Sequence, residues 1–236
     1  IITEMYAYVA FLVVFLTYGM ETAFFRFSTT NKDGKLNIYS NTLYSLITSS
    51  TIFVAMATIF SENIADWLKY PNHKEYIIWF SLIVSLDAVS SIPLAKLRLQ
   101  EKAKKFALVN LLNVGINIFL NLFFLIYCKE AYESGHTNWI TENLYNPEIG
   151  VGYVFISNLI ASVIKFGVLM PTMSFKGTFD FTILKQMTNY ACPMLLVGLA
   201  YVVNETLDRA MLKSILFNQY LENGDAKNSS QALSMA

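Results

Sequence analysis

The sequence predicts an all-α membrane protein with six transmembrane helices. Only 14% of its 236 residues are charged, whereas a soluble domain carries about 25%. The charges collect between apolar runs, and about 20 apolar residues are enough to cross the bilayer. Two of these runs, 106–127 and 149–170, are apolar nearly all round, unlike the helices of soluble proteins, which keep a polar stripe. The six runs cover residues 5–25, 43–60, 77–94, 106–127, 149–170 and 187–217.

The first run, 5–25, follows Glu4 and precedes Arg26, Lys32 and Lys35. Lys and Arg in short loops mark the cytoplasmic side of a membrane protein. The run is therefore expected to end inside, with Ile1 outside. An outside start is simplest to explain if another helix precedes this run.

The connector between the third and fourth runs sets the orientation of all the others. Residues 96–105, which follow the expected end of the third run at Pro93, hold five of the seventeen Lys and Arg. The connectors that this orientation places inside carry Arg26, Lys32, Lys35, Lys96, Arg98, Lys102, Lys104, Lys105, Lys176 and Lys185. The outer ones carry Lys69, Lys74, Lys129 and Lys227. No loop contradicts this bias, so both ends of the chain, including the polar tail 218–236, are expected outside.

Other classes of protein fit the sequence poorly. The basic clusters are short and flanked by apolar runs, so no nucleic-acid site is expected. Cys128 and Cys192 have no metal-ligand spacing and lie at the edge of a run and inside one, which argues against a metal site and a disulfide. His73 and His136 fall in outer connectors, and the sequence has neither a P-loop nor a G-x-G-x-x-G motif. We therefore expect no catalytic residues, no cofactor and no enzymatic activity.

Ionisable residues inside the runs are the first candidates for a functional site, because each costs about 2.5–3.5 kcal/mol at the membrane centre. Glu21 is either a structural partner or an acid that lines a cavity. Asp87, in the middle of the third run, must be protonated, paired with another helix or wetted by a cavity. Arg26 and Lys165 either snorkel to the headgroups or serve a site.

Four asparagines in the fourth run follow a helical spacing. Asn110, Asn113, Asn117 and Asn121 share one stripe of a helix. Amides in such a stripe either join neighbouring helices by hydrogen bonds or line a path for a hydroxyl-rich substrate. Both interpretations remain open.

The last run carries charges within its apolar sequence. Glu205, Arg209 and Lys213 are spaced by four residues and share one helical face, with Asp208 beside them. A charged stripe at membrane depth must face protein or water. Pro193 permits a kink in the same helix. We expect this helix to line an aqueous cavity.

Four segments, Tyr18–Phe27, Ile92–Lys102, Gly150–Gly152 and Leu207–Arg209, resemble the Wzx-type flippases of polysaccharide and O-antigen biosynthesis. These flippases belong to the multidrug/oligosaccharidyl-lipid/polysaccharide (MOP) superfamily of MATE-like exporters. The resemblance covers essentially the whole chain and implies a protein of 12–14 helices in two lobes. It makes this chain a fragment that lacks the first helix and most of the second lobe. Residues 1–171 would then belong to the first lobe, 172–186 to the cytoplasmic connector, and 187–217 to the first helix of the second lobe.

The resemblance also implies a function. Such a protein would move a polyprenyl-diphosphate-linked oligosaccharide across the bacterial inner membrane, for O-antigen (lipopolysaccharide), capsule or exopolysaccharide synthesis. Phosphate requires cations and sugar hydroxyls require amides, and the candidates are Arg26, Lys165, Arg209, Asn113, Asn117 and Asn121. The candidates for ion coupling or charge pairing are Glu21, Asp87, Glu205 and Asp208.

The expected partners are the lipid bilayer, the lipid-linked oligosaccharide, a proton or sodium ion, and the polysaccharide polymerase and glycosyltransferases. Two other hypotheses remain. One is a cation-coupled small-molecule exporter of the multidrug type with the same fold, in which Asp87 or Glu21 takes the ion. The other is a membrane scaffold without transport activity.

Overall fold

A computed structural model describes the backbone of residues 2–30, 35–67, 74–134, 145–146, 149–150 and 152–222. It describes side chains at residues 8–30, 37–65, 74–134, 145–146, 149–150 and 152–204. The regular elements in this part of the chain are all helices, and six of the helical segments are long and apolar enough to cross a membrane. These segments are Tyr8–Thr30, Asn37–Ile59, Lys74–Leu99, Ala103–Glu133, Gly152–Thr172 and Phe181–Asn204. The predicted all-α fold with six transmembrane helices is confirmed.

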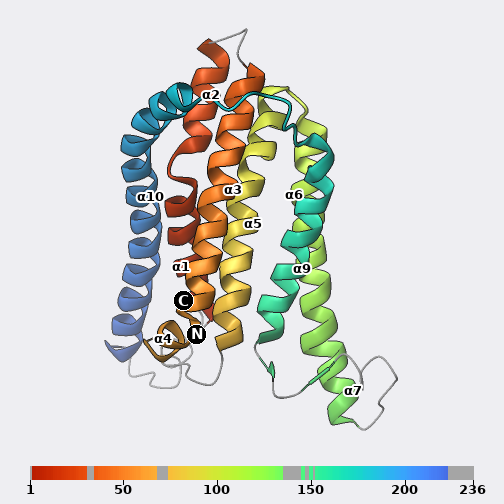
Figure 1. Cartoon of the computed structure of the whole chain (residues 1–236). Helices are drawn as coiled ribbons and strands as arrows, with labels where there is room; N and C mark the ends of the chain where they lie inside the picture. Colours follow the sequence, from red (N-terminus) through yellow and green to blue (C-terminus); the bar gives the residue numbers. More distant parts are fainter. Residues whose placement is uncertain are drawn as a thin grey trace.

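Helix α5 (Lys74–Leu99) lies at the centre of the bundle (Figure 1). It packs against α3 (Lys35–Ile59) on one side and α9 (Gly152–Leu169) on the other, and α1 (Ile2–Thr17) also contacts it. Helix α9 in turn packs against α6 (Ala103–Leu122), which also contacts α5 directly. Small buried side chains at these contacts, such as Ser85 on α5 and Ser157 on α9, allow the close approach of helices that membrane proteins favour.

The first span is broken into α1 and α2 (Met20–Thr30) at Tyr18 and Gly19, whose φ angles are 34° and 72°. These values lie in the left-handed region, which glycine adopts readily and tyrosine rarely. Helix α10 (Phe181–Glu222) packs directly on the break, and a Cβ at position 19 would lie 2.6 Å from the carbonyl oxygen of Ala191. Gly19 therefore permits both the turn and the contact with α10.

Helix α5 does not end at Pro93 as expected but continues to Leu99. An internal proline costs one backbone hydrogen bond, which a long buried helix tolerates through its packing. Residues 96–105 are consequently not a loop: only Gln100–Lys102 connect α5 to α6. Lys96 and Arg98 project from the last turn of α5, while Lys104 and Lys105 lie in the first turn of α6.

Helices α3 and α10 begin earlier than the apolar runs at 43 and 187 indicate, because polar side chains hold the connector between α9 and α10 onto α3. Ser40 accepts a hydrogen bond from the backbone N–H of Gly177 at 3.1 Å, and Asn41 accepts one from Asp180 at 2.9 Å. The Asp180 carboxylate then accepts a bond from the Thr182 N–H at 2.8 Å, which caps α10.

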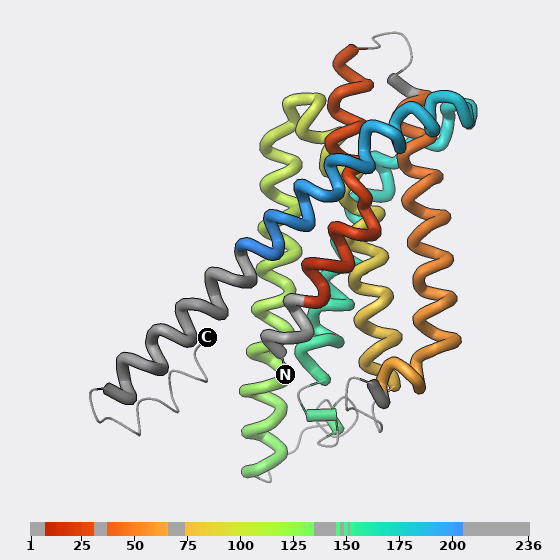
Figure 2. Tube along the Cα trace, turned by 90° about the vertical axis from the view of Figure 1, so that its left-hand side faces the viewer, coloured from red at the N-terminus to blue at the C-terminus, as the bar shows by residue number. Residues whose placement is uncertain are grey.

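The α5–α6 turn, the end of α2 and the α9–α10 connector all lie at one end of the bundle (Figure 1). We call this the basic end, because it carries Arg26, Lys96, Arg98, Lys102, Lys104, Lys105, Lys176 and Lys185. Helix α4 (Ser61–Trp67) lies at the opposite end. Figure 2 shows α10 crossing the outside of the bundle at an angle to the other helices.

Candidate functional site

The interface of α5 and α9 contains an ion pair in the membrane-spanning part of the bundle. The ammonium group of Lys165 lies 2.6 Å from Asp87 Oδ1, and the hydroxyl of Ser162 donates to the same oxygen at 3.0 Å. The Lys165 side chain is 9% exposed and that of Asp87 is 27% exposed. Both helices bring these groups together because small residues, Ala88 and Ala161 among them, are fully buried nearby in sequence.

This geometry places two of the predicted site residues in direct contact. Lys165 points to the α5 interface and bonds Asp87 instead of extending along the membrane to the headgroups. A buried pair is held by its mutual attraction and hydrogen bonds, which offset the cost of removing both ions from water. The pair is electrically neutral as a unit, but each partner alone would be a charge in an apolar environment.

A second ion pair joins α2 to α5 at the basic end. Glu21 forms its ion pair with Arg98, which lies in the last turn of α5, and not with Arg26, which is closer in the sequence. The Arg98 guanidinium also lies over the rings of Phe25 and Phe106, 5.4 Å and 5.2 Å from their centres. Arg98 is 42% exposed and Glu21 is 35% exposed, so water reaches both.

Arg26 lies on α2, with its guanidinium 4.2 Å from the centre of the Tyr190 ring on α10. The face of an aromatic ring attracts a cation, so this contact links the first span to the last. Arg26 remains exposed, which leaves its guanidinium accessible to an anion.

The asparagine stripe lies on the less exposed face of α6, which packs toward α9. The Asn121 amide donates to Asn117 Oδ1 at 2.6 Å. Within the described residues, Asn113 Oδ1 and Asn121 Oδ1 are buried without a hydrogen-bond partner. The apolar face of α6, with Leu111 and Phe119, is the exposed one. The stripe thus keeps unused hydrogen-bonding capacity inside the protein.

The charged stripe of the last run lies on α10, whose helical backbone continues through Glu205, Asp208 and Arg209. The side chains of these three residues lie outside those that the structure describes. Their placement on one helical face, and toward a cavity, stays a prediction.

The sequence matches the family model described as "polysaccharide biosynthesis protein" over residues 1–222. The chain belongs to the polysaccharide biosynthesis protein family. No curated protein and no solved structure matches it. With its six apolar helices, it is a multi-pass membrane protein of this family.

The sequence of this polysaccharide biosynthesis protein did not reveal several contacts that hold its basic end together. Lys96 donates to the carbonyl oxygen of Thr172 at 2.8 Å and lies 4.0 Å from the centre of the Tyr39 ring. It thereby joins α5 to the end of α9 and to α3. The contacts of Asn37, Ser40, Asn41 and Tyr44 with the α9–α10 connector were missed as well. These four polar residues are spaced by three, one and three positions, which is typical of one helical face. This spacing could have predicted that the face binds another part of the protein.

The site residues of this family member therefore form two polar layers. One is the buried Asp87–Lys165 pair, and the other is the basic end with Arg26, Lys96 and the Glu21–Arg98 pair. Among the described residues, no group of three or more His, Cys, Asp and Glu side chains could hold a metal ion.

Proposed function

We propose that this protein is a flippase that moves a polyprenyl-diphosphate-linked oligosaccharide across the bacterial cytoplasmic membrane for polysaccharide synthesis. The observation that carries the proposal is the Asp87–Lys165 pair, a buried cation bonded to a half-buried carboxylate inside the membrane-spanning bundle of a polysaccharide biosynthesis protein. Ionisable groups at this depth are costly and typically serve a transport path.

The diphosphate and the sugar hydroxyls of such a substrate cannot enter hydrocarbon without compensating partners. Arg26 at the basic end supplies an accessible cation for the first encounter. Lys165 supplies a second cation deeper in the bundle, and the Asn113 and Asn121 carbonyl groups supply acceptors for hydroxyls. Arg209 on α10 would add a third cation from the facing lobe.

The Asp87–Lys165 pair supports a simple exchange between two states. Lys165 bonds either Asp87 or the diphosphate, because one ammonium group cannot satisfy both at full strength. Rocking of the two lobes around this position would give alternating access.

The orientation of the bundle is part of the proposal, with the basic end in the cytoplasm. A Lys102→Cys variant tests it, since Lys102 is exposed in the α5–α6 turn. A membrane-permeant maleimide should label this cysteine in whole cells and an impermeant one should not. Labelling by the impermeant reagent would reverse the orientation.

The transport proposal is tested with a double variant, Asp87→Asn with Lys165→Met, in cells that depend on this gene for surface polysaccharide. Removing both charges keeps the interface neutral, so the protein should reach normal levels in the membrane. Surface polysaccharide should be lost while the lipid-linked precursor accumulates. Lys129→Met, which removes an exposed lysine, is the control and should export normally. Normal export by the double variant would remove the pair from the transport path.

The half-buried carboxylate of Asp87 within a membrane span also favours a second candidate, a cation-coupled exporter of small molecules with the same fold. That protein would use Asp87 as the ion-binding group. Increased drug sensitivity of a deletion strain that still displays its surface polysaccharide would support this candidate over the flippase.

A further inference from the structure

The connector between α9 and α10, residues 173–180, exposes large apolar side chains. Phe175, Phe179 and, at the start of α10, Phe181 are 49%, 55% and 70% exposed. The rings of Phe175 and Phe179 pack beside Tyr44 of α3, with their centres 5.7 Å and 6.4 Å from the centre of its ring. These two rings are therefore held in place while part of each remains uncovered. Apolar side chains gathered on a protein surface mark a contact with a membrane or with another protein.

Side chains of α3 satisfy the backbone of this connector. The N–H groups of residues 177, 178 and 180 donate to α3 side chains at 3.1, 3.2 and 2.9 Å. The carbonyl oxygens of residues 174 and 175 accept from the hydroxyls of Ser40 and Tyr44 at 3.3 and 3.5 Å. Water would supply such partners to a solvated connector, whereas irregular backbone at the membrane must find them in the protein. The connector is thus suited to surroundings that are poor in water.

The connector lies where the membrane-spanning segments end. The spans on either side of it are Gly152–Thr172 and Phe181–Asn204, so residues 173–180 sit at the boundary of the apolar region. Figure 2 shows the connector on the outer side of α3, at the edge of the bundle. This edge faces the phospholipid headgroups and the first carbons of their acyl chains. Phenylalanine is typical of segments that lie in this interfacial layer.

Lysines alternate with these phenylalanines. Lys176 follows Phe175, and Lys185 lies one turn after Phe181 on the same face of α10. Both lysines are exposed, and neither forms an ion pair with another described residue. Asp180 is the only acid in residues 173–190, and its carboxylate accepts from N–H groups at the start of α10. The surface therefore combines exposed rings with positive charge.

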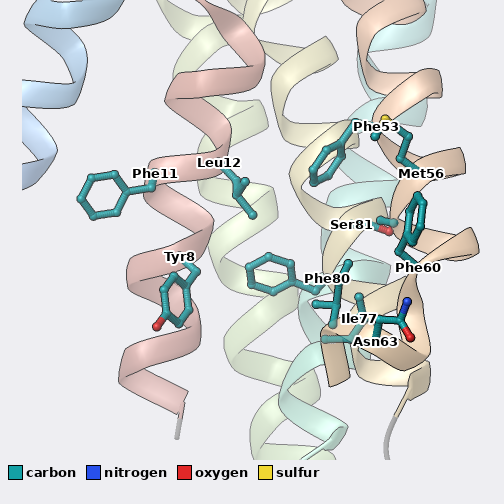
Figure 3. Close-up of a pocket in the computed structure, with 12 residues that line it drawn as sticks. Tyr8, Phe11, Leu12, Phe53, Met56, Phe60, Asn63, Ile77, Phe80 and Ser81 are labelled. Atoms are coloured by element: carbon teal, nitrogen blue, oxygen red, sulfur yellow. The ribbon is translucent and has the colours of Figure 1, made fainter. Parts of the chain in front are cut away.

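The opposite end of α3 offers a contrast, because it borders an apolar cavity between α1, α3 and α5. Figure 3 shows Tyr8 of α1, Phe53 of α3 and Phe80 of α5 at this cavity, and none of its described lining residues is basic. Apolar surface within a membrane does not by itself distinguish one lipid from another, since lipid chains are equally apolar. The connector differs from the cavity in its lysines, which favour lipids that carry a negative charge.

We propose that the connector and the first turns of α10 bind an anionic phospholipid of the surrounding membrane. Lys176 and Lys185 attract its negatively charged headgroup, and the exposed faces of Phe175, Phe179 and Phe181 contact the upper part of its acyl chains. Because α10 begins in this site, the bound lipid holds the start of α10 at the membrane boundary. The site requires neither a saccharide nor transport, so it is independent of the proposed flippase function.

The test places a photoreactive benzoylphenylalanine at position 179 of the gene-encoded protein, in vesicles of equal amounts of phosphatidylcholine and phosphatidylglycerol. Irradiation should join it to phosphatidylglycerol at least about five times as often as to phosphatidylcholine, which is the effect of one lysine near an anionic surface. Phe119, an exposed residue within the span of α6, is the control position and should join both lipids equally. At position 179, adducts with another protein chain, equal adducts with both lipids, or no lipid adduct would overturn the proposal.

Variants of the lysines show whether charge causes this preference. Lys176→Gln combined with Lys185→Gln should abolish the preference for phosphatidylglycerol at position 179. Lys129→Gln, at the opposite end of the bundle, should leave it unchanged (Figure 1). A preference that survives the double substitution would refute the assignment of the headgroup to these two lysines.

A second measurement needs no photoreactive group. Phosphatidylglycerol added to the unsubstituted protein in detergent should raise the unfolding temperature more than phosphatidylcholine does, because a ligand of the folded state stabilises it. This difference should shrink at high salt and vanish in the double lysine variant. An equal effect of both lipids would contradict the proposal. Selective binding by a protein whose deletion leaves surface polysaccharide intact would refute the flippase function and leave the lipid site standing.

Discussion

Two of the ion pairs that α5 forms with its neighbours, one with α9 and one with α2, have the same chemistry in different surroundings. Lys165 and Asp87 are 9% and 27% exposed, whereas Arg98 and Glu21 are 42% and 35% exposed. The Lys165 side chain is nearly inaccessible, whereas both partners of the pair at the basic end are partly exposed. The comparison teaches that burial, and not the presence of opposite charges, decides how strongly each pair constrains the fold and how useful it is as a switch.

Removing one partner of the buried pair should have the largest effect. Lys165→Met leaves Asp87 as an unpaired carboxylate, which should destabilise the protein by about 3–5 kcal/mol. Thermal unfolding of the purified protein in detergent measures the loss. The double variant with Asp87→Asn should recover most of this stability. A single variant as stable as the unsubstituted protein would show that the Asp87 carboxylate does not depend on Lys165.

Substitution of Gly19 tests how strongly the break between α1 and α2 depends on its backbone conformation and on its contact with α10. Gly19→Ala places a Cβ against the Ala191 carbonyl oxygen at a φ of 72°, and such strain costs about 1–3 kcal/mol. Gly115 on α6 is the control, since a Cβ there meets nothing within 4 Å. Gly115→Ala should raise the unfolding temperature slightly, because alanine favours a helix. A neutral Gly19→Ala would mean that α10 can move away from the break.

The connector contacts repeat the comparison between buried and exposed groups within a single helix. Asn41 is fully buried and accepts from the Asp180 N–H, whereas Asn37, one turn earlier, accepts from the Thr178 N–H at 3.2 Å in an exposed position. Asn41→Ala should cost about 1–2 kcal/mol, because the half-buried N–H of Asp180 loses its acceptor. Asn37→Ala should cost almost nothing, since water replaces the amide. Equal losses of thermal stability would show that exposure does not govern these contacts.

The sequence predicted the six spans because apolar length is a local property. It also identified Asp87 and Lys165 as ionisable residues within membrane spans. Their pairing could not be predicted, because the two residues are 78 positions apart and no local sequence pattern reports such a contact. Glu21 bonds Arg98 and not Arg26 for a geometric reason: a separation of five residues puts Glu21 and Arg26 on different faces of one helix.

Helix ends were predicted less well than helix existence. Residues 35–42 of α3 include polar side chains that bind the connector, and these contacts stabilise the first turns of the helix. Pro93 was taken as an end, but tertiary packing carries α5 past it. Hydropathy identifies the part of a helix that is apolar enough to lie in the membrane. It does not identify helical turns that are stabilised by contacts with other parts of the protein.

The exposed pair at the basic end should give the smallest effect and the clearest contrast with Lys165. Arg98→Met should change stability by no more than about 1 kcal/mol, since exposed ion pairs contribute little. Most of that change should come from the lost contacts with Phe25 and Phe106, because Glu21→Gln keeps those ring contacts and should be nearly neutral. Thermal unfolding at low and high salt separates the two contributions, since salt screens the ion pair. If Arg98→Met proved as damaging as Lys165→Met, exposure could not be what distinguishes the two pairs.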